Sequence, residues 1–237
     1  MSFIRHLLFW VKDFFFPTVC PLCGGVLTGI SEIQCGLCRQ CRSGVACVPG
    51  EKCSLCGKPL ISERDVCLSC RNGEGKSYDR LWVLFPYTGK FRKLLVSYKF
   101  SKNLALADFF AEKILEIIDS NPVLKDACIV PVPPRPGKIK DSGWDQIDYL
   151  VKRLEKTGKG LNFRRCLKRR KSKVQKQLNR TERMENLKGR IYLYAKAPET
   201  VLVIDDVVTT GSTMEECSAV LKDGGAEKVY GLCLFYN

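Results

Sequence analysis

Two adjacent carboxylates, Asp205 and Asp206, follow a short apolar run and precede a loop rich in hydroxyl groups. The run, Val201 to Ile204, is mostly β-branched, which is typical of a strand buried on both faces. Ligands bind outside the carboxyl ends of strands in parallel sheets, so we expect both carboxylates to face a ligand. They could take ribose hydroxyls directly or hold a Mg2+ ion that does so. An acidic strand end beside an ordinary turn is the alternative.

The loop after the carboxylates has the composition of a phosphate-binding turn. Its residues are Thr209, Thr210, Gly211, Ser212 and Thr213. A helix is predicted to follow, and the N–H groups at a helix start suit a phosphate monoester. Gly211 would let the backbone approach the phosphate closely. Either Ser212 with Glu215 or Thr213 with Glu216 could form a capping box. No Walker A sequence occurs, so the pattern favours a sugar phosphate over simple nucleotide hydrolysis.

Ten of the fourteen cysteines lie between residues 20 and 70, mostly in C-x2-C pairs. Two such pairs supply four thiolates, the tetrahedral set that Zn2+ prefers. The simplest assignment gives one structural ion to Cys20, Cys23, Cys38 and Cys41, and a second to Cys53, Cys56, Cys67 and Cys70. Cys35 could replace Cys38 or Cys41, whereas Cys47 lacks a pair. A disulfide framework would require secretion, for which the N-terminus gives no sign.

The first sixteen residues carry an apolar stripe, with Phe3, Leu7, Trp10 and Phe14 at helical spacing. We expect a short helix docked on the body of the protein, and a surface for a lipid or a partner is the alternative. Charged residues interrupt the stripe, so no membrane span is predicted. A cytoplasmic protein is expected.

The positive charge is concentrated in one segment. The formal net charge is +14, and residues 151–190, with eight Lys and eight Arg against three Glu, carry +13. This concentration favours contact with a polyanion, such as single-stranded DNA, over charge for solubility. The candidate DNA contacts are Arg164, Arg165, Lys168, Arg169, Arg170, Lys171 and Lys173. Trp144, Tyr149 and Phe163 lie nearby and could stack on bases or belong to the core.

The order of elements predicts two domains. Residues 1–76 would form the N-terminal helix and a small double zinc ribbon, and residues 77–237 a larger α/β domain, joined by the polar linker 72–77. Helices are expected at 103–119 and 145–156. We expect an inner strand at 128–132, a central strand at 201–204 and a last strand that closes the sheet at 228–236. Strands that alternate with helices indicate a mostly parallel sheet with flanking helices.

The segment VLVIDDVVTTGST, residues 201–213, resembles the motif that binds phosphoribosyl pyrophosphate (PRPP) in type I phosphoribosyltransferases. With the cysteine pairs before it, the chain resembles the ComF/ComFC family of competence proteins. The stretches around Tyr87 to Ile114, Cys128 to Pro136 and Val174 to Leu193 agree, with Gln177, Arg183 and Asn186 at matching places. One loop departs from the family pattern. Gly143 and Gln146 match, but Ser142, Trp144 and Asp145 replace Arg, Phe and Asn.

The resemblance implies a type I phosphoribosyltransferase-like fold that binds PRPP, or a related sugar phosphate, with Mg2+. By resemblance, Asp205 and Asp206 meet the ribose and residues 209–213 hold the 5-phosphate. Arg183 is a further catalytic candidate, and Lys138 and Lys140 could meet pyrophosphate, although Asp145 weakens that part of the site. The resemblance also implies a role in DNA uptake with a helicase partner. An active phosphoribosyltransferase on an unidentified acceptor, or a zinc-ribbon adaptor for the helicase, are the alternatives.

Overall fold

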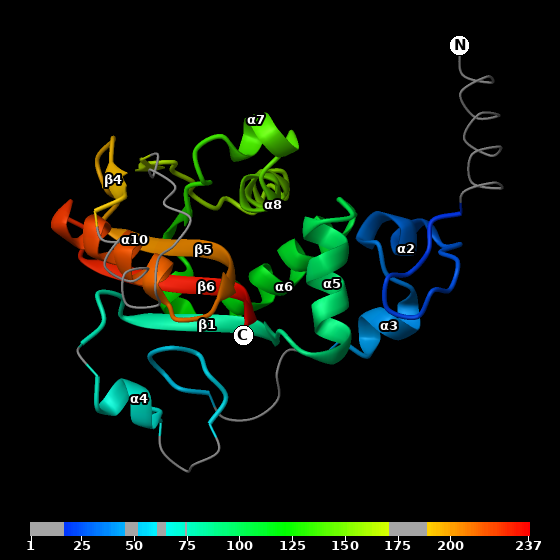
Figure 1. Cartoon of the computed structure of the whole chain (residues 1–237), viewed down its shortest axis with the longest axis horizontal. Helices are drawn as coiled ribbons and strands as arrows, with labels where there is room; N and C mark the ends of the chain where they lie inside the picture. The colour runs from blue at the N-terminus through cyan, green and yellow to red at the C-terminus, as the bar shows by residue number, and fades with distance from the viewer. Residues whose placement is uncertain (1–16, 46–51, 61–64, 74, 171–188) are drawn as a thin grey trace, which may run out of the picture.

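The computed structural model describes residues 17–45, 52–60, 65–73, 75–170 and 189–237 (Figure 1). The N-terminal stripe of Phe3, Leu7, Trp10 and Phe14 lies outside the described residues, as does Cys47. Within the described part of the chain, no helix is both long and apolar enough to cross a membrane.

A four-stranded parallel sheet forms the centre of the larger part of the protein. Its strands are β1 (Arg80–Pro86), β6 (Lys228–Tyr236), β5 (Thr200–Val208) and β2 (Cys128–Pro131), in that spatial order. Most side chains of β1, β5 and β6 are buried, as expected for strands that are covered on both faces. The predicted α/β class with a parallel sheet is confirmed.

Helices cover both faces of this sheet, and each face has its own apolar core. Alternate side chains of a strand point to opposite faces. Leu202 and Ile204 of β5 pack with α5 (Gly89–Lys99), α6 (Leu106–Ser120) and α8 (Gln146–Glu155). Val201 and Val203 belong to the second core, with α10 (Ser212–Asp223). The shorter elements are η1 (Pro122–Leu124), α7 (Lys138–Ser142) and an antiparallel hairpin of β3 (Leu167–Arg169) and β4 (Ile191–Leu193).

The cysteine-rich region forms two ribbons that pack on different parts of the α/β body. The first contains α2 (Ile30–Cys35) and α3 (Arg39–Ser43) and lies beside α5 and α6, whereas α4 (Leu68–Arg71) of the second lies below β1 in Figure 1. Cys20, Cys35 and Leu37 of the first ribbon share a core with α6. The division of the chain at residues 76 and 77 stays a prediction.

Three details of the strands differ from the prediction. The strand expected at 201–204 extends over Thr200–Val208, because its pairing with β6 continues to Val208 after its pairing with β2 ends at Ile204. The predicted inner strand, β2, lies at the edge of the sheet and is covered there by a single bridge from Ile129 to Phe163. The last strand, β6, is inside the sheet rather than closing it.

Candidate functional site

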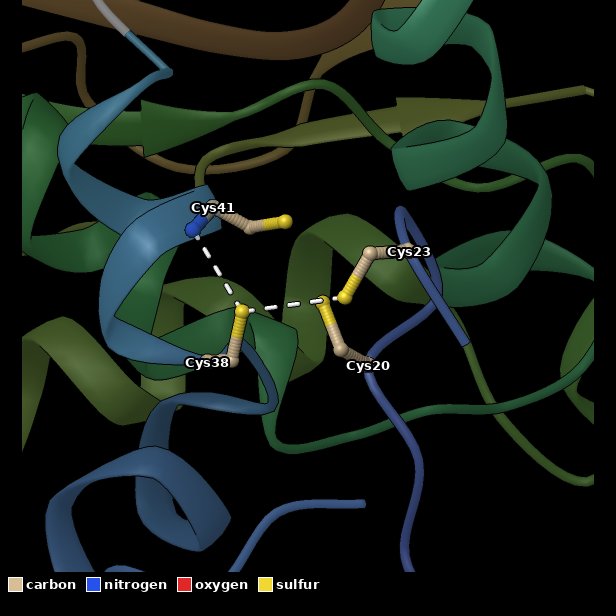
Figure 2. A group of neighbouring side chains, drawn as sticks. All are labelled: Cys20, Cys23, Cys38 and Cys41. Carbon is tan, nitrogen blue, oxygen red and sulfur yellow. Dashed lines mark hydrogen bonds between the residues drawn. The ribbon is translucent and has the colours of Figure 1, made fainter. Parts of the chain in front are cut away.

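The eight cysteines assigned to zinc form two compact groups. In the first group the sulfur atoms of Cys20, Cys23, Cys38 and Cys41 lie within 4.8 Å of one another (Figure 2), and the same holds for Cys53, Cys56, Cys67 and Cys70 in the second. The Sγ atoms of Cys23 and Cys38 are 3.7 Å apart, and those of Cys56 and Cys67 are 3.8 Å apart. Sulfurs at the corners of a tetrahedron with Zn–S bonds of about 2.3 Å would be about 3.8 Å apart. Both groups therefore fit Zn2+.

Backbone amides prepare one thiol in each group for metal binding. Burial opposes ionisation of Cys20, but N–H groups of Cys38, Cys23 and Leu22 outweigh it and lower the pKa of Cys20 to about 7. At Cys53, burial is outweighed in the same way by the N–H groups of Cys56, Cys67 and Leu55, and its pKa is also about 7. Since the thiolate is the metal ligand, these amides favour the bound form.

Cys35, which could have replaced Cys38 or Cys41 as a zinc ligand, has a different place in the structure. The Cys35 thiol is buried at the end of α2 and donates to the carbonyl oxygens of Glu32 and Leu37, at 3.6 and 3.4 Å. It lies outside the group that contains Cys38 and Cys41. The first ribbon thus uses the second pair of its C-x2-C-x2-C run, Cys38 and Cys41.

A pocket opens where β5 continues beyond the end of β2. It has a volume of about 230 Å3, and Asp205 and Asp206 of β5 line it together with the loop after β2 and the start of α8. The other charged lining residues are Lys99, Arg135, Lys138, Asp145 and Arg169. The carboxylates lie within the strand rather than beyond it, and the early end of β2 gives them access to the pocket.

Asp206 belongs to a chain of polar side chains. Its Oδ2 accepts hydrogen bonds from Lys99 Nζ at 2.6 Å and from Gln146 Nε2 at 2.5 Å. The Gln146 amide oxygen accepts from Lys138 Nζ, which also forms an ion pair of 2.6 Å with Asp145. Asp206 is 8% exposed, so these partners compensate a carboxylate that is largely shielded from water.

Asp205 is less well compensated than Asp206. Burial, together with the neighbouring charge of Asp206, raises the pKa of Asp205 to about 8, although Arg169 acts in the opposite direction. Its Oδ1 accepts a hydrogen bond of 2.8 Å from the Asp206 amide. Two carboxylates side by side disfavour each other's ionisation, and a ligand that donates hydrogen bonds to them relieves this.

The phosphate-loop candidates line a second, smaller pocket of about 130 Å3. Asp205, Val207 and Thr213 line both pockets, so the two are adjacent. The smaller pocket is formed by the loop 207–213, with Met214 and Cys233. Gly211 adopts φ +78°, a conformation that favours glycine, and it precedes α10 directly. The five predicted loop residues are thus brought beside Asp205.

The predicted capping box at this helix is wrong. Gly211 is the N-cap of α10 and has no side chain to cap the helix, while the Ser212 amide donates to Thr210 Oγ1 at 3.4 Å. Glu215 instead accepts hydrogen bonds from Ser77, and Glu216 accepts from the amides of Arg190 and Ile191. Both glutamates accept hydrogen bonds from donors that are distant in the chain. Neither therefore folds back over the helix start, where an anion could bind.

Arg169 lies in the pocket, although it was counted among the DNA contacts. It is on β3, and its Nη2 atom is buried without a hydrogen-bond partner among the described residues. A buried guanidinium donor without a partner is unusual in a folded protein. Sequence analysis missed this position, and it also missed Lys99 and Arg135, because their distance along the chain gives no indication that they converge.

The two lysines predicted to meet pyrophosphate have different places. Lys138 lines the pocket but is paired with Asp145, whereas Lys140 is exposed and is not among the lining residues. Asp145 also accepts hydrogen bonds from the amides of Ile147 and Asp148, so it caps α8. The family's Asn would suit the same capping position.

The remaining basic candidates surround the hairpin. Arg165 forms ion pairs with Asp148 and Glu155, and Arg164 donates to the Lys196 carbonyl oxygen. Lys168 lies over the ring of Tyr194, at 4.1 Å from its centre, and Arg170 lies over Tyr192 at 5.2 Å. Lys171, Lys173 and Arg183 lie outside the described residues, with Gln177 and Asn186.

The aromatic residues proposed for base stacking belong to the protein's own packing. Trp144, Tyr149 and Phe163 are partly buried against the core of α6 and α8. Trp144 makes edge contacts with Tyr98 and Tyr149. The core alternative is therefore the correct one for all three. Tyr194, which is 47% exposed, was not predicted.

Comparison with known proteins matches the cysteine-rich region and, separately, most of the chain. A family profile described as a double zinc ribbon domain matches residues 11–71. The chain is 26% identical to competence protein ComFC of Streptococcus pneumoniae, over 89% of this chain and 96% of the relative. It is 27% identical to competence protein F of Haemophilus influenzae, over 91% of this chain and 95% of the relative. It is 27% identical to DNA utilization protein YhgH of Salmonella typhi, over 84% of this chain and 96% of the relative. With similarity along most of each chain and a double zinc ribbon, this protein is similar to the ComF/ComFC family of competence proteins.

Proposed function

We propose that this protein binds the ribose 5-phosphate part of PRPP with Mg2+ and acts in DNA uptake. The observation that carries the proposal is the adjacency of the two pockets, which share Asp205 and Thr213. One offers carboxylates to sugar hydroxyls, and the other offers a helix start with a glycine N-cap to a phosphate. The DNA role rests on the relatives that are called competence and DNA utilization proteins.

The sugar would lie between the two pockets. Asp205 and Asp206 would accept hydrogen bonds from its hydroxyls, and their oxygen atoms are the type of ligand that Mg2+ prefers. The 5-phosphate would lie against the loop 209–213, where Gly211 exposes the backbone. The bound ion would neutralise the negative charge of the pyrophosphate. Arg169 and Arg135 are the lining cations without a carboxylate ion pair among the described residues, so they would meet the same group.

Calorimetric titration with PRPP and Mg2+ tests this pocket. The wild type is expected to bind, and the variant with Asp205→Asn and Asp206→Asn is expected to lose most of the heat. Asp126→Asn is the control, because Asp126 is exposed and lies outside both pockets. Equal heats from the wild type and the double variant would refute the assigned site.

Catalysis is a separate hypothesis on the same site. In a transfer reaction the bond between C1 of the ribose and pyrophosphate breaks, and positive charge develops on the sugar while negative charge develops on the leaving group. The lining carboxylates would stabilise the positive charge on the sugar, and Arg169 would stabilise the negative charge on the leaving group. Arg183 stays a further catalytic candidate. Release of pyrophosphate in the presence of a panel of acceptors would decide between an enzyme and a binding protein.

Contact with single-stranded DNA is supported by the outer face of the hairpin. Lys168 and Tyr192 are cross-strand partners in β3 and β4, and Arg170 and Tyr194 follow at the ends of these strands. Cations and aromatic rings side by side are the combination that single-strand binders use for phosphates and bases. Binding of a labelled oligonucleotide should weaken steeply as salt increases. Affinity that is the same at low and physiological salt would rule this contact out.

The adaptor hypothesis can be tested on exposed apolar side chains of the ribbons. Val26, Ile30 and Leu68 are 53%, 78% and 64% exposed. Deleting residues 1–76 would also remove Cys20, Cys35 and Leu37 from the shared core, so point variants are the cleaner test. If a ribbon docks the helicase, Ile30→Asp or Leu68→Asp should weaken co-purification of the two proteins. Undiminished association in both variants would exclude these surfaces.

A further inference from the structure

The second zinc ribbon is fastened to β1, the strand at one edge of the sheet. The amide of Leu81 donates to the carbonyl oxygen of Leu55, which lies between two of the zinc cysteines, at 2.9 Å. Lys52 Nζ donates to the carbonyl oxygen of Val83, also at 2.9 Å. At Gly57 the contact is closer still, because a Cβ atom there would lie 2.7 Å from the Leu81 oxygen. This ribbon and β1 therefore hold each other in register.

The segment that follows this ribbon is hydrogen-bonded to the first turn of α10. Ser77 donates from its amide and from its hydroxyl to Oε1 of Glu215, at 2.9 and 2.6 Å. Glu215 is in the first turn of α10, and its own amide donates to the carbonyl oxygen of Gly211. Two hydrogen bonds from Ser77 to Glu215 and one from Glu215 to Gly211 thus connect the segment after the ribbon to the glycine of the phosphate loop.

Tyr78 provides a second connection to the same loop. It is 3% exposed, and its hydroxyl is the atom closest to where a Cβ of Gly211 would stand, at 3.8 Å. Burial, with Cys56, Glu215 and Cys70 nearby, raises its pKa. The ring therefore lies between the second ribbon and the phosphate loop.

Asp79, the next residue, is held by Val229 of β6 and Lys222 of α10, and open space lies beside these contacts. A pocket of about 410 Å3 lies between Leu55 of the ribbon, the linker from Lys76 to Asp79 and the end of α10. The Oε2 atom of Glu215 is buried without a partner among the described residues. Ser77 is thus the only hydrogen-bond donor from another segment that reaches the Glu215 carboxylate within the described residues.

The first ribbon has no comparable connection. It packs on α6 through the ion pair of Arg42 with Glu112 and through Gly36 against Ala105. Within the described ranges, no hydrogen bond or ion pair joins it to residues 209–216. The two ribbons, which have the same cysteine chemistry, therefore differ in their relation to the phosphate loop.

We infer that Ser77 and Glu215 are positioning residues, through which zinc in the second ribbon keeps the phosphate loop in its binding conformation. The inference rests on the proposed phosphate site. Loss of this ion would release the linker, and the first turn of α10 would lose the hydrogen bonds that Ser77 donates. Loss of zinc from the first ribbon would leave the loop as it is.

The test compares two cysteine variants of the full chain, Cys70→Ser in the second ribbon and Cys41→Ser in the first. Ribose 5-phosphate is the titrated probe, and hydrogen exchange is followed in peptides that cover residues 209–216. We expect Cys70→Ser to bind the probe about tenfold more weakly, as for the loss of one or two hydrogen bonds, and to exchange faster in this segment. Cys41→Ser should match the wild type in both readouts. Equal effects of the two variants, or none in either, would overturn the inference.

Milder substitutions cover the case in which a cysteine variant fails to fold. Glu215→Ala should weaken binding of the probe about tenfold, and Glu215→Gln, which keeps an acceptor oxygen for Ser77, should restore it. Failure of Gln to restore binding would also overturn the inference. A wild type that does not bind ribose 5-phosphate would defeat the proposed function, and the inference with it. If the wild type binds the probe but Cys70→Ser exchanges in residues 209–216 at the wild-type rate, only the inference is defeated.

Discussion

Single residues in the pocket differ in how well their charges are compensated. Asp206 has Lys99 and Gln146, and Lys138 has Asp145. Asp205 has only a backbone amide as a hydrogen-bond donor, and the Nη2 atom of Arg169 has no partner within the described residues. Uncompensated groups of this kind destabilise a folded protein and are common where a ligand binds.

The first prediction concerns the stability of the protein with Asp205→Asn. The pKa of Asp205 in the folded protein is about 8, above its ordinary value near 4, so its contribution to stability is present at low pH and is lost as the pH rises towards 8. The free energy of unfolding of the variant should therefore exceed that of the wild type increasingly between pH 5 and 8, by on the order of 1 kcal/mol per pH unit at most. Urea unfolding at several pH values, without Mg2+, measures this. A difference that does not change with pH would contradict it.

The second prediction separates two neighbouring arginines. Arg169→Met should weaken PRPP binding about tenfold, because a charge-assisted hydrogen bond to the ligand is lost, and should change stability little, because the guanidinium is incompletely paired. Arg170→Met, on the opposite face of the hairpin, should leave PRPP binding unchanged and weaken oligonucleotide binding instead. Calorimetry and a DNA-binding assay on both variants check this. Identical behaviour of the two would contradict the division between the faces.

At the scale of elements, each ribbon has a glycine after its first cysteine pair, but only the glycine of the second ribbon is closely packed. Gly24 and Gly57 have similar left-handed conformations, with φ of +76° and +69°. A Cβ at Gly24 would meet nothing within 4 Å, whereas at Gly57 it would lie 2.7 Å from the Leu81 oxygen and 2.9 Å from Val83. The two positions are equivalent in sequence but different in packing.

The third prediction uses this pair. Gly24→Ala should cost about 1 kcal/mol of stability, from the left-handed backbone alone. Gly57→Ala should cost clearly more, roughly 2–4 kcal/mol, because the Cβ clashes with the β1 backbone as well. Chemical unfolding of both variants in the presence of zinc measures the difference. Equal losses of stability in the two variants would mean that close packing of Gly57 against β1 does not contribute.

The elements also show why local patterns predicted some features and missed others. The apolar run before Asp205 and the C-x2-C pairs are local, and both kinds of element were predicted. The capping box failed because Glu215 and Glu216 bind Ser77 and the start of β4, which are distant in the chain. The positions of β2 at the edge and β6 inside the sheet are set by pairing order, which residue patterns do not encode. Arg169 was misplaced because a charge run does not reveal which face of a strand each residue occupies.

At the scale of the whole molecule, the cysteine-rich region is part of the body rather than an appendage. The first ribbon contributes Cys20, Leu27, Cys35 and Leu37 to the core of α5, α6 and α8. The second is hydrogen-bonded to β1. The fourth prediction follows from this: removing zinc with a chelator should lower the melting temperature of the entire chain by roughly 10 °C or more, in one transition.

Scanning calorimetry with and without the chelator checks this prediction. Adding zinc back is the control for reversibility. An α/β body that melts at an unchanged temperature after zinc removal would show that the ribbons are energetically independent of it.

The alternation of side chains along β3 has one more consequence. Leu167 and Arg169 face inward, and Lys168 faces Tyr194 on the other side. Inserting a single residue in this strand would exchange the two sets, placing the wrong cations in the cavity and a leucine in water. A substitution that keeps each residue on its own face would therefore disturb the hairpin less than an insertion, which would alter the cavity and the outer basic surface together.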